Sequence, residues 1–255
     1  MLKIRNEQMQ EFKAVSLQKF EDEMVCHIQE FTPPHYLVLG EDGVREVVRL
    51  GIREAKRYAF TNRGPVQFYI EMMFMIGSYF DTDPQYPWAA QILNDQTIPD
   101  QMERADKLFY EMQEYLKAVA GPQNEYALRA FQSLSAARDQ SVPAMGANFN
   151  EEMLRRLDAI YPEKSHYIGE PALSRLIAHA AENADANGMG MDPGPALFSA
   201  LEFAMGYGFS VDPQFPWVIN TINNPAIAEP LKRIERLKSK SLTYLDNVLV
   251  YFQQG

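Results

Sequence analysis

Two aspartates, Asp83 and Asp212, could carry acid chemistry, because both stand in the same unusual frame. Phe-x-x-Asp-Pro-Gln-aromatic-Pro-Trp occupies residues 80–88 and recurs at residues 209–217. A carboxylate beside aromatic rings could serve as the acid or base of a hydrolase, with the rings forming the wall of a small-ligand pocket. The candidate residues of the two loops are Asp81, Asp83, Tyr86, Trp88, Asp212, Phe215 and Trp217.

The same residues have a structural interpretation, which we favour. An aspartate before proline forms an Asx-type turn, two prolines stiffen the loop, and the tryptophan can pack the loop onto the preceding helix. A fold element has to be present in both halves of a repeated chain, whereas an active site does not. No histidine, serine, cysteine or lysine recurs beside both loops to act as nucleophile or base. We therefore expect no catalytic residues, and the hydrolase or small-ligand binder stays as the alternative.

Metal and cofactor sites are not predicted. Asp81 and Asp83 could begin a calcium loop, but Pro84 follows them, and no glycine or closing glutamate stands at the required spacing. His35, His166 and His179 lack the spacing of zinc ligands. No nucleotide-binding or nucleophile-elbow motif occurs in the chain.

Cys26 is the single cysteine, so the chain cannot form an internal disulfide, which fits a reducing compartment. Cys26 and His27 are neighbours on a predicted helix and point apart, so they form no nucleophile–base pair. We expect a half-buried structural cysteine. Residues 1–5 lack a signal-peptide apolar run, and the longest apolar stretch is too short for a bilayer. A cytoplasmic protein is expected.

One register relates the two halves well beyond the motif. The constant offset that carries Asp83 onto Asp212 also pairs Phe20 with Phe149, Gly77 with Gly206, and Tyr115 with Tyr244. The sequence thus predicts a tandem duplication of a helical module of roughly 125 residues. We expect a first copy at 1–121, a linker helix and loop at 122–148, and a second copy at 149–255.

Hydrophobic periodicity near 3.6 residues predicts helices throughout, and no sustained period-two alternation indicates a strand. The expected helices cover about 6–31, 41–63, 66–79, 88–93, 99–120, 124–138, 150–161, 170–182, 196–207 and 228–249. The segment 66–79 is apolar on nearly every side and should be the buried centre of its module. The predicted fold class is all-α.

The halves differ most at residues 183–195, which are rich in glycine, proline and asparagine. We expect a loop there, whereas its counterpart, residues 54–66, should continue helical further. Exposed methionines could give an adaptable contact surface, which makes Met189, Met191 and Asp192 candidate partner contacts. A degenerated linker is the plainer interpretation.

The net charge of −10 argues against nucleic-acid binding, which needs a basic face. Residues 1–126 carry −7 and the remainder −3, so acidity gathers in the first half. The basic residues of the last predicted helix, from Lys232 to Lys240, fit a solvated face, a contact with the acidic half, or an anionic partner.

Four stretches of the chain resemble a group of largely uncharacterised bacterial proteins. They are Phe80-Asp-Thr-Asp-Pro-Gln-Tyr-Pro-Trp88, the preceding Ile-Glu-Met-Met-Phe-Met-Ile-Gly, the opening Phe-Glu-Asp-Glu-Met, and the Gly-Glu-Asp-Gly that begins the second predicted helix. That group is encoded in type VI secretion loci, beside spike, tip and toxin genes. The resemblance covers nearly the whole chain, although Ser210-Val211 replace Asp81-Thr82 in the second copy. The group has no established catalytic residues.

The resemblance implies a cytoplasmic adaptor or chaperone that loads a secreted effector, or an immunity protein that blocks one. Together with the acidic composition, it predicts a non-enzymatic protein-binding module. The expected partner is a toxin-like effector or a component of the secretion spike, and no oligomeric state is predicted.

Overall fold

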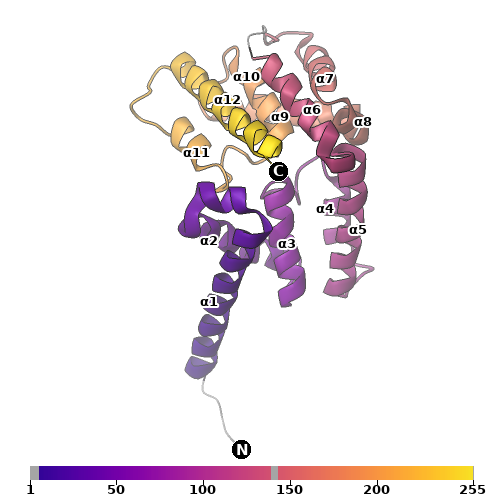
Figure 1. Cartoon of the computed structure of the whole chain (residues 1–255), viewed down its shortest axis with the longest axis vertical. Helices are drawn as coiled ribbons and strands as arrows, with labels where there is room; N and C mark the ends of the chain where they lie inside the picture. The colour runs from indigo at the N-terminus through magenta and orange to yellow at the C-terminus, as the bar shows by residue number, and fades with distance from the viewer. Residues whose placement is uncertain (1–5, 139–142, 255) are drawn as a thin grey trace, which may run out of the picture.

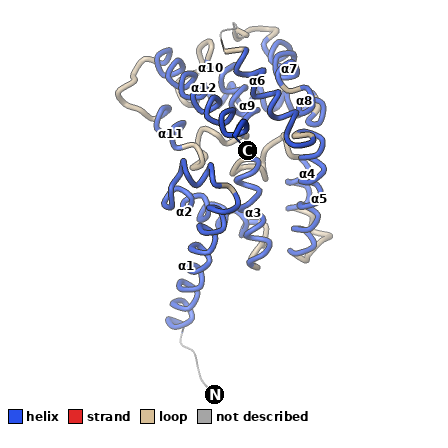
Figure 2. The backbone as a smooth tube through the Cα atoms, in the orientation of Figure 1, coloured by secondary structure: helices blue, strands red, loops and turns tan. Residues whose placement is uncertain are grey.

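The computed structural model describes residues 6–138 and 143–254, and every regular element in these ranges is helical. Figure 2 shows helices joined by loops, with no strand in the described part of the chain. The all-α prediction is confirmed.

The described part of the first half contains five α-helices. They are α1 (Asn6–Phe31), α2 (Pro33–Arg57), α3 (Arg63–Ile76), α4 (Pro87–Leu93) and α5 (Gln101–Val119). The proline pair at 33–34 ends α1 as predicted, because proline fits only the first turn of a helix, and Pro33 also opens α2. Within α2, Gly40 has non-helical angles (φ 65°, ψ 178°), so one short helical stretch precedes the helix that we expected from Glu41.

A 3₁₀ turn, η1 (Pro122–Asn124), and α6 (Glu125–Ala136) lead to the second half. Its helices are α7 (Phe149–Ile160), α8 (Pro162–Ile168), α9 (Glu170–Ala186), α10 (Gly194–Met205), α11 (Pro216–Ile222) and α12 (Pro230–Gln254). The sequence register between the halves maps both ends of α4 onto those of α11, and the last residue of α2 onto the last residue of α9. The expectation that residues 54–66 continue helical further than 183–195 was therefore wrong.

Both central helices end earlier than predicted. We expected them to reach Tyr79 and Tyr207, but α3 ends at Ile76 and α10 at Met205. Gly77 and Gly206 follow with φ of 103° and 99°, values that only glycine adopts without strain. The glycines, rather than the end of the apolar run, decide where the helices stop.

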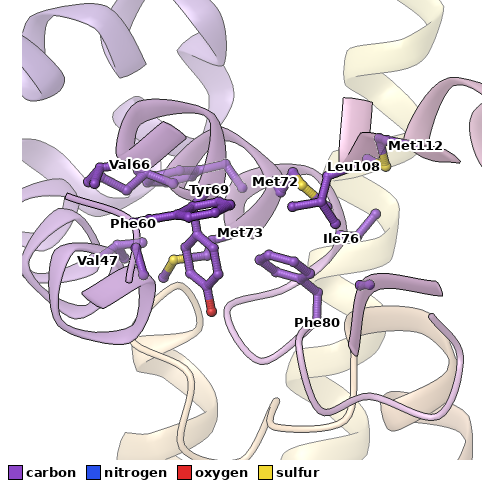
Figure 3. Packing of buried hydrophobic residues seen from close by; sticks show 14 of the residues in the cluster. Val47, Phe60, Val66, Tyr69, Met72, Met73, Ile76, Phe80, Leu108 and Met112 are labelled. Carbon is purple, nitrogen blue, oxygen red and sulfur yellow. The ribbon is translucent and has the colours of Figure 1, made fainter. Parts of the chain in front are cut away.

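The predicted buried centre, α3, lies in the largest apolar cluster of the described residues. Tyr69, Met72 and Met73 have no exposed surface, and Figure 3 shows them packed among side chains of α2, α5 and the motif loop. Met75 departs from the prediction, since 40% of its surface is exposed. One flank of α3 is therefore open to solvent.

Figure 1 places the first half below the second, with α1 extending from the body toward the N-terminus. Residues 8–19 of α1 are all exposed. The halves meet where the C-terminal end of α3 faces the second half, and again where α5 packs against α8. There the Tyr161 hydroxyl donates to the Val119 carbonyl at 2.7 Å, and the rings of Tyr115 and Tyr167 lie 5.2 Å apart.

None of the helices in the described ranges combines the length and the apolar character that a bilayer crossing requires.

Candidate functional site

The two motif aspartates lie at one junction, and each binds backbone of the opposite half. Asp212 accepts hydrogen bonds from the Ser78 backbone N–H at 2.9 Å and from the Ser78 hydroxyl at 2.7 Å. Asp83 accepts from the Tyr207 backbone N–H at 2.8 Å. Ser78 and Tyr207 are related by the same sequence offset as Asp83 and Asp212, and each directly follows the glycine that ends α3 or α10. The two carboxylates therefore hold equivalent turns in opposite halves.

The motif glutamines close the same helix ends. Gln85 donates through Nε2 to the Glu202 carbonyl at 3.0 Å, and Gln214 donates to the Met73 carbonyl at 2.8 Å. Each of these carbonyls also accepts the backbone N–H of the glycine that ends its helix, at 2.9 Å in both halves, so the glutamine adds a second hydrogen bond to the carbonyl. The aspartate and glutamine of each loop thus act together on the end of the other half's central helix.

Each loop also forms the predicted Asx turn. The backbone N–H of Gln85 donates to Asp83 Oδ1 at 2.8 Å, and that of Gln214 donates to Asp212 Oδ1 at 2.9 Å. In each loop, therefore, one carboxylate forms both the local Asx turn and the hydrogen bond to the opposite half.

Glycine is required where the two halves touch. A Cβ on Gly77 would stand 3.1 Å from the Met205 carbonyl oxygen, and one on Gly206 would stand 3.3 Å from the Ile76 carbonyl oxygen. Each glycine also has a positive φ. Backbone packs closely on backbone here.

The junction offers little room for a substrate. Asp83 and Asp212 expose 3% and 1% of their surface. The crevice between the two glycine turns is too narrow to admit a water molecule. Burial raises the pKa of both carboxyl groups, against the opposing effect of the hydrogen bonds that they accept.

The aromatic residues of each loop pack on the last long helix of their own half. Tyr86 and Trp88 lie 5.2 and 6.4 Å from the Tyr115 ring of α5. Phe215 and Trp217 lie 6.0 and 5.7 Å from the Tyr244 ring of α12. Trp88 also shares an apolar cluster with side chains of α3, and Trp217 packs against a cluster that contains side chains of α10.

Asp81 does not join the junction. It is 3% exposed and accepts the Tyr58 hydroxyl at 2.7 Å. Its counterpart Ser210 donates instead to the side chain of Asn183 at 3.2 Å. Both positions tie the motif loop to the end of the neighbouring helix, α2 or α9.

Two buried charged residues beside the junction were not predicted from sequence. Lys164 donates to the Phe203 carbonyl and lies 4.9 Å from the Phe203 ring centre. Burial lowers the pKa of Lys164 to about 8, while the charge of Asp83 opposes this shift. Glu202 has no exposed surface and contacts His179 and Asn183 at 3.0 and 2.9 Å.

A sequence signal existed for one of them. Glu202 interrupts the apolar run of α10, where a charged residue must face a partner or solvent. Burial raises its pKa, and hydrogen bonds from His179 and Asn183 oppose the rise. Lys164 gave no such signal, because its short helix reads as an ordinary polar turn.

The remaining candidates lie apart from the junction. Met189 is completely buried, so it offers no surface contact; this corrects the expectation of exposed methionines throughout the loop. Met191 is 47% exposed, and Asp192 accepts the Met145 backbone N–H at 2.8 Å. Cys26 is exposed rather than half-buried, since it lies on the outer side of α1.

The described residues contain no cluster of histidine, cysteine, aspartate or glutamate suited to a metal ion. Comparisons with protein-family models, curated proteins and solved structures find no match for this chain.

Proposed function

We propose that this protein is a non-enzymatic protein-binding module. The observation that carries the proposal is the use of Asp83. One of its oxygens accepts from the Gln85 backbone N–H, and the other accepts from Gln85 Nε2 and the Tyr207 backbone N–H. A carboxylate so engaged and 3% exposed is committed to closing a helix end, which leaves it poorly placed for acid–base chemistry.

Exposed apolar side chains support a binding role. Along the solvent-exposed part of α1, Phe12 and Val15 expose 66% and 64% of their surface, and Tyr110 on α5 exposes 68%. Large exposed apolar groups with acidic neighbours are typical of surfaces that meet another protein. These groups lie in the half that carries −7 of the total charge of −10.

The resemblance to proteins of type VI secretion loci suggests the partner. We propose a secreted effector or a component of the secretion spike, with this protein acting as a cytoplasmic adaptor or an immunity protein. An immunity protein would cover the active site of its toxin, whereas an adaptor would hold a non-toxic region of the effector.

We also infer that the halves are tandem copies of one helical module of roughly 125 residues. The common offset of helix bounds and the reciprocal Asp–Gln contacts support this inference. If a pseudo-two-fold axis relates the modules, it would pass between Gly77 and Gly206.

The test is affinity capture of the full-length protein from cells that produce it, followed by mass spectrometry. We expect a toxin-like protein or a spike component, and Asp83→Asn should still capture it if it remains folded. Absence of any specific partner at near-endogenous expression would contradict the binding role. A hydrolytic activity that disappears in a folded Asp83→Asn variant would favour the enzyme alternative.

A further inference from the structure

The outward side of α5 combines exposed apolar side chains with exposed acidic ones. Met102, Phe109 and Tyr110 expose 47%, 46% and 68% of their surface. The Phe109 ring lies 5.8 Å from the Tyr110 ring and 6.0 Å from Phe68 of α3, so the apolar surface continues onto the neighbouring helix. We call Met102, Glu103, Asp106, Phe109, Tyr110 and Glu114 the α5 face.

Helical spacing places these residues together. Asp106 stands four residues after Met102 and three and four before Phe109 and Tyr110, so it lies between the apolar side chains on one side of the helix. The face runs from residue 102 to residue 114, which is about 18 Å of helix. It is long enough to contact three turns of a partner helix.

The acidic groups of this face form no ion pair with any residue that the structure describes. Glu103, Asp106 and Glu114 are exposed, and none forms a salt bridge in the described part of the chain, not even with Lys107 of the same helix. By contrast, carboxylates between α1 and α2 are paired with an arginine. The α5 face therefore presents available negative charge around aromatic side chains.

Four of the six equivalent positions in the second half carry different chemistry, whereas Leu231 and Glu235 keep the apolar and acidic character of Met102 and Asp106. In the register of the repeat, Lys232, Lys238 and Ser239 of α12 correspond to Glu103, Phe109 and Tyr110 in turn. Packing in the two halves therefore does not require acidic or aromatic residues at these positions. Their presence on α5 alone needs another explanation.

We propose that the α5 face binds a cationic amphipathic helix of a partner protein. The apolar side of that helix would cover Phe109 and Tyr110, and its lysines or arginines would meet Glu103, Asp106 and Glu114. Exposed aromatic groups supply most of the affinity at such surfaces, while charge complementarity mainly directs encounter and orientation. This inference rests on the proposed binding function and names the surface and the chemistry of the partner.

The test uses the full-length protein and a fluorescein-labelled synthetic helix of about 18 residues, built from leucine and lysine at amphipathic spacing. Two reference peptides replace lysine by glutamate, or keep the composition in a non-amphipathic order. Fluorescence anisotropy is recorded at ~0.15 M salt, where long-range charge effects are largely screened. We expect the wild type to prefer the leucine–lysine helix over both references.

Two pairs of variants locate the binding. Phe109→Ala/Tyr110→Ala should weaken binding at least about tenfold, whereas Leu231→Ala, a similarly exposed apolar side chain of α12, should leave it unchanged. Glu103→Gln/Asp106→Asn should weaken binding several-fold more than Asp42→Asn/Glu46→Gln, which removes the same charge from exposed positions of α2. Circular dichroism and melting curves verify that each variant is folded.

Equal binding of the three peptides by the wild type would overturn the proposal, as would equal losses in the two charge pairs. Sedimentation would identify another occupant: self-association that Phe109→Ala/Tyr110→Ala abolishes would assign the face to a second copy and overturn the proposal. Capture from cells with wild type and Phe109→Ala/Tyr110→Ala separates the two proposals. Equal recovery of one partner would leave the binding function intact and reject the α5 face, whereas no recovery by the wild type would reject the binding function.

Discussion

The ends of α3 and α10 are closed by the same two side-chain types, an aspartate and a glutamine from the opposite half, but their surroundings differ in polarity. Met73, whose carbonyl accepts from Gln214, is replaced in the second half by the buried Glu202. His35 lies edge-on to Phe74 at 5.7 Å, and at the equivalent place Lys164 lies over Phe203. The backbone contacts are the same in both halves, while the neighbouring side chains are not.

This difference separates two demands on the chain. The backbone N–H groups of Ser78 and Tyr207 must find partners where the halves meet, so both loops use an aspartate there, and both add a glutamine to a helix-end carbonyl. Beyond those atoms, different side chains satisfy packing: a histidine lies against Phe74 and a buried lysine against Phe203. Substitutions should therefore cost most at the shared contacts and least at the divergent ones.

The largest effect is expected at the glycines. Gly77→Ala should lower the free energy of unfolding by roughly 2–4 kcal/mol, because φ of 103° strains any other residue and the new Cβ would stand 3.1 Å from the Met205 oxygen. Denaturant unfolding measures the loss. Gly146→Ala is the control, since a Cβ there has nothing within 4 Å. Similar stability of the two variants would show that the two glycine turns can move apart without loss of stability.

Next in size is the loss of a junction carboxylate. Asp83→Asn should cost roughly 1–3 kcal/mol, because an amide cannot accept from all three N–H groups that Asp83 binds. Asp95→Asn alters an exposed Asx turn made with Thr97 and should cost less. Comparison of their urea unfolding midpoints tests this, and an equal cost would mean that the cross-half bond adds nothing.

Lys164 should make stability depend on pH in the second half. Its pKa is lowered to about 8 in the folded protein from an ordinary value of 10.5, so between these values the unfolded chain binds more protons. Stability contributed by this group should therefore rise with pH, by about 1–2 kcal/mol from pH 7.5 to 9.5. Lys164→Met should remove that rise, whereas the exposed Lys232→Met should keep it. Melting temperatures across this range measure it, and an unchanged rise in Lys164→Met would reject the assignment.

The smallest effect is expected for the hydrogen bonds of Asp81 and Ser210, which differ between the halves and link each motif loop to α2 or α9. Tyr58→Phe removes the donor to the buried Asp81 and should cost about 1 kcal/mol. Ser210→Ala breaks a longer bond of 3.2 Å to Asn183 and should cost less. A thermal shift comparison of the two variants tests the order, and a larger loss in Ser210→Ala would reverse it.

The sequence predicted local features better than long-range ones. Pro33 and Pro34 place a helix break, and an aspartate before proline predicts an Asx turn, because both effects act within a few residues. The sequence did not predict that Asp83 would bind Tyr207, since an Asx turn looks the same whether the second oxygen faces its own half or the other. Lys164 was missed for a related reason: its partner carbonyl belongs to α10, 39 residues away.

The reciprocal closure also constrains the order of events during synthesis. Ser78 and its partner Asp212 are separated by 134 residues, and the chain grows at about 5–20 residues per second. Synthesis of the chain from Ser78 to Asp212 therefore takes roughly 7 to 27 seconds, and during this time the turn after α3 lacks its partner. Contacts of this sequence separation form late in folding, so the nascent first half must stay soluble until its counterpart emerges.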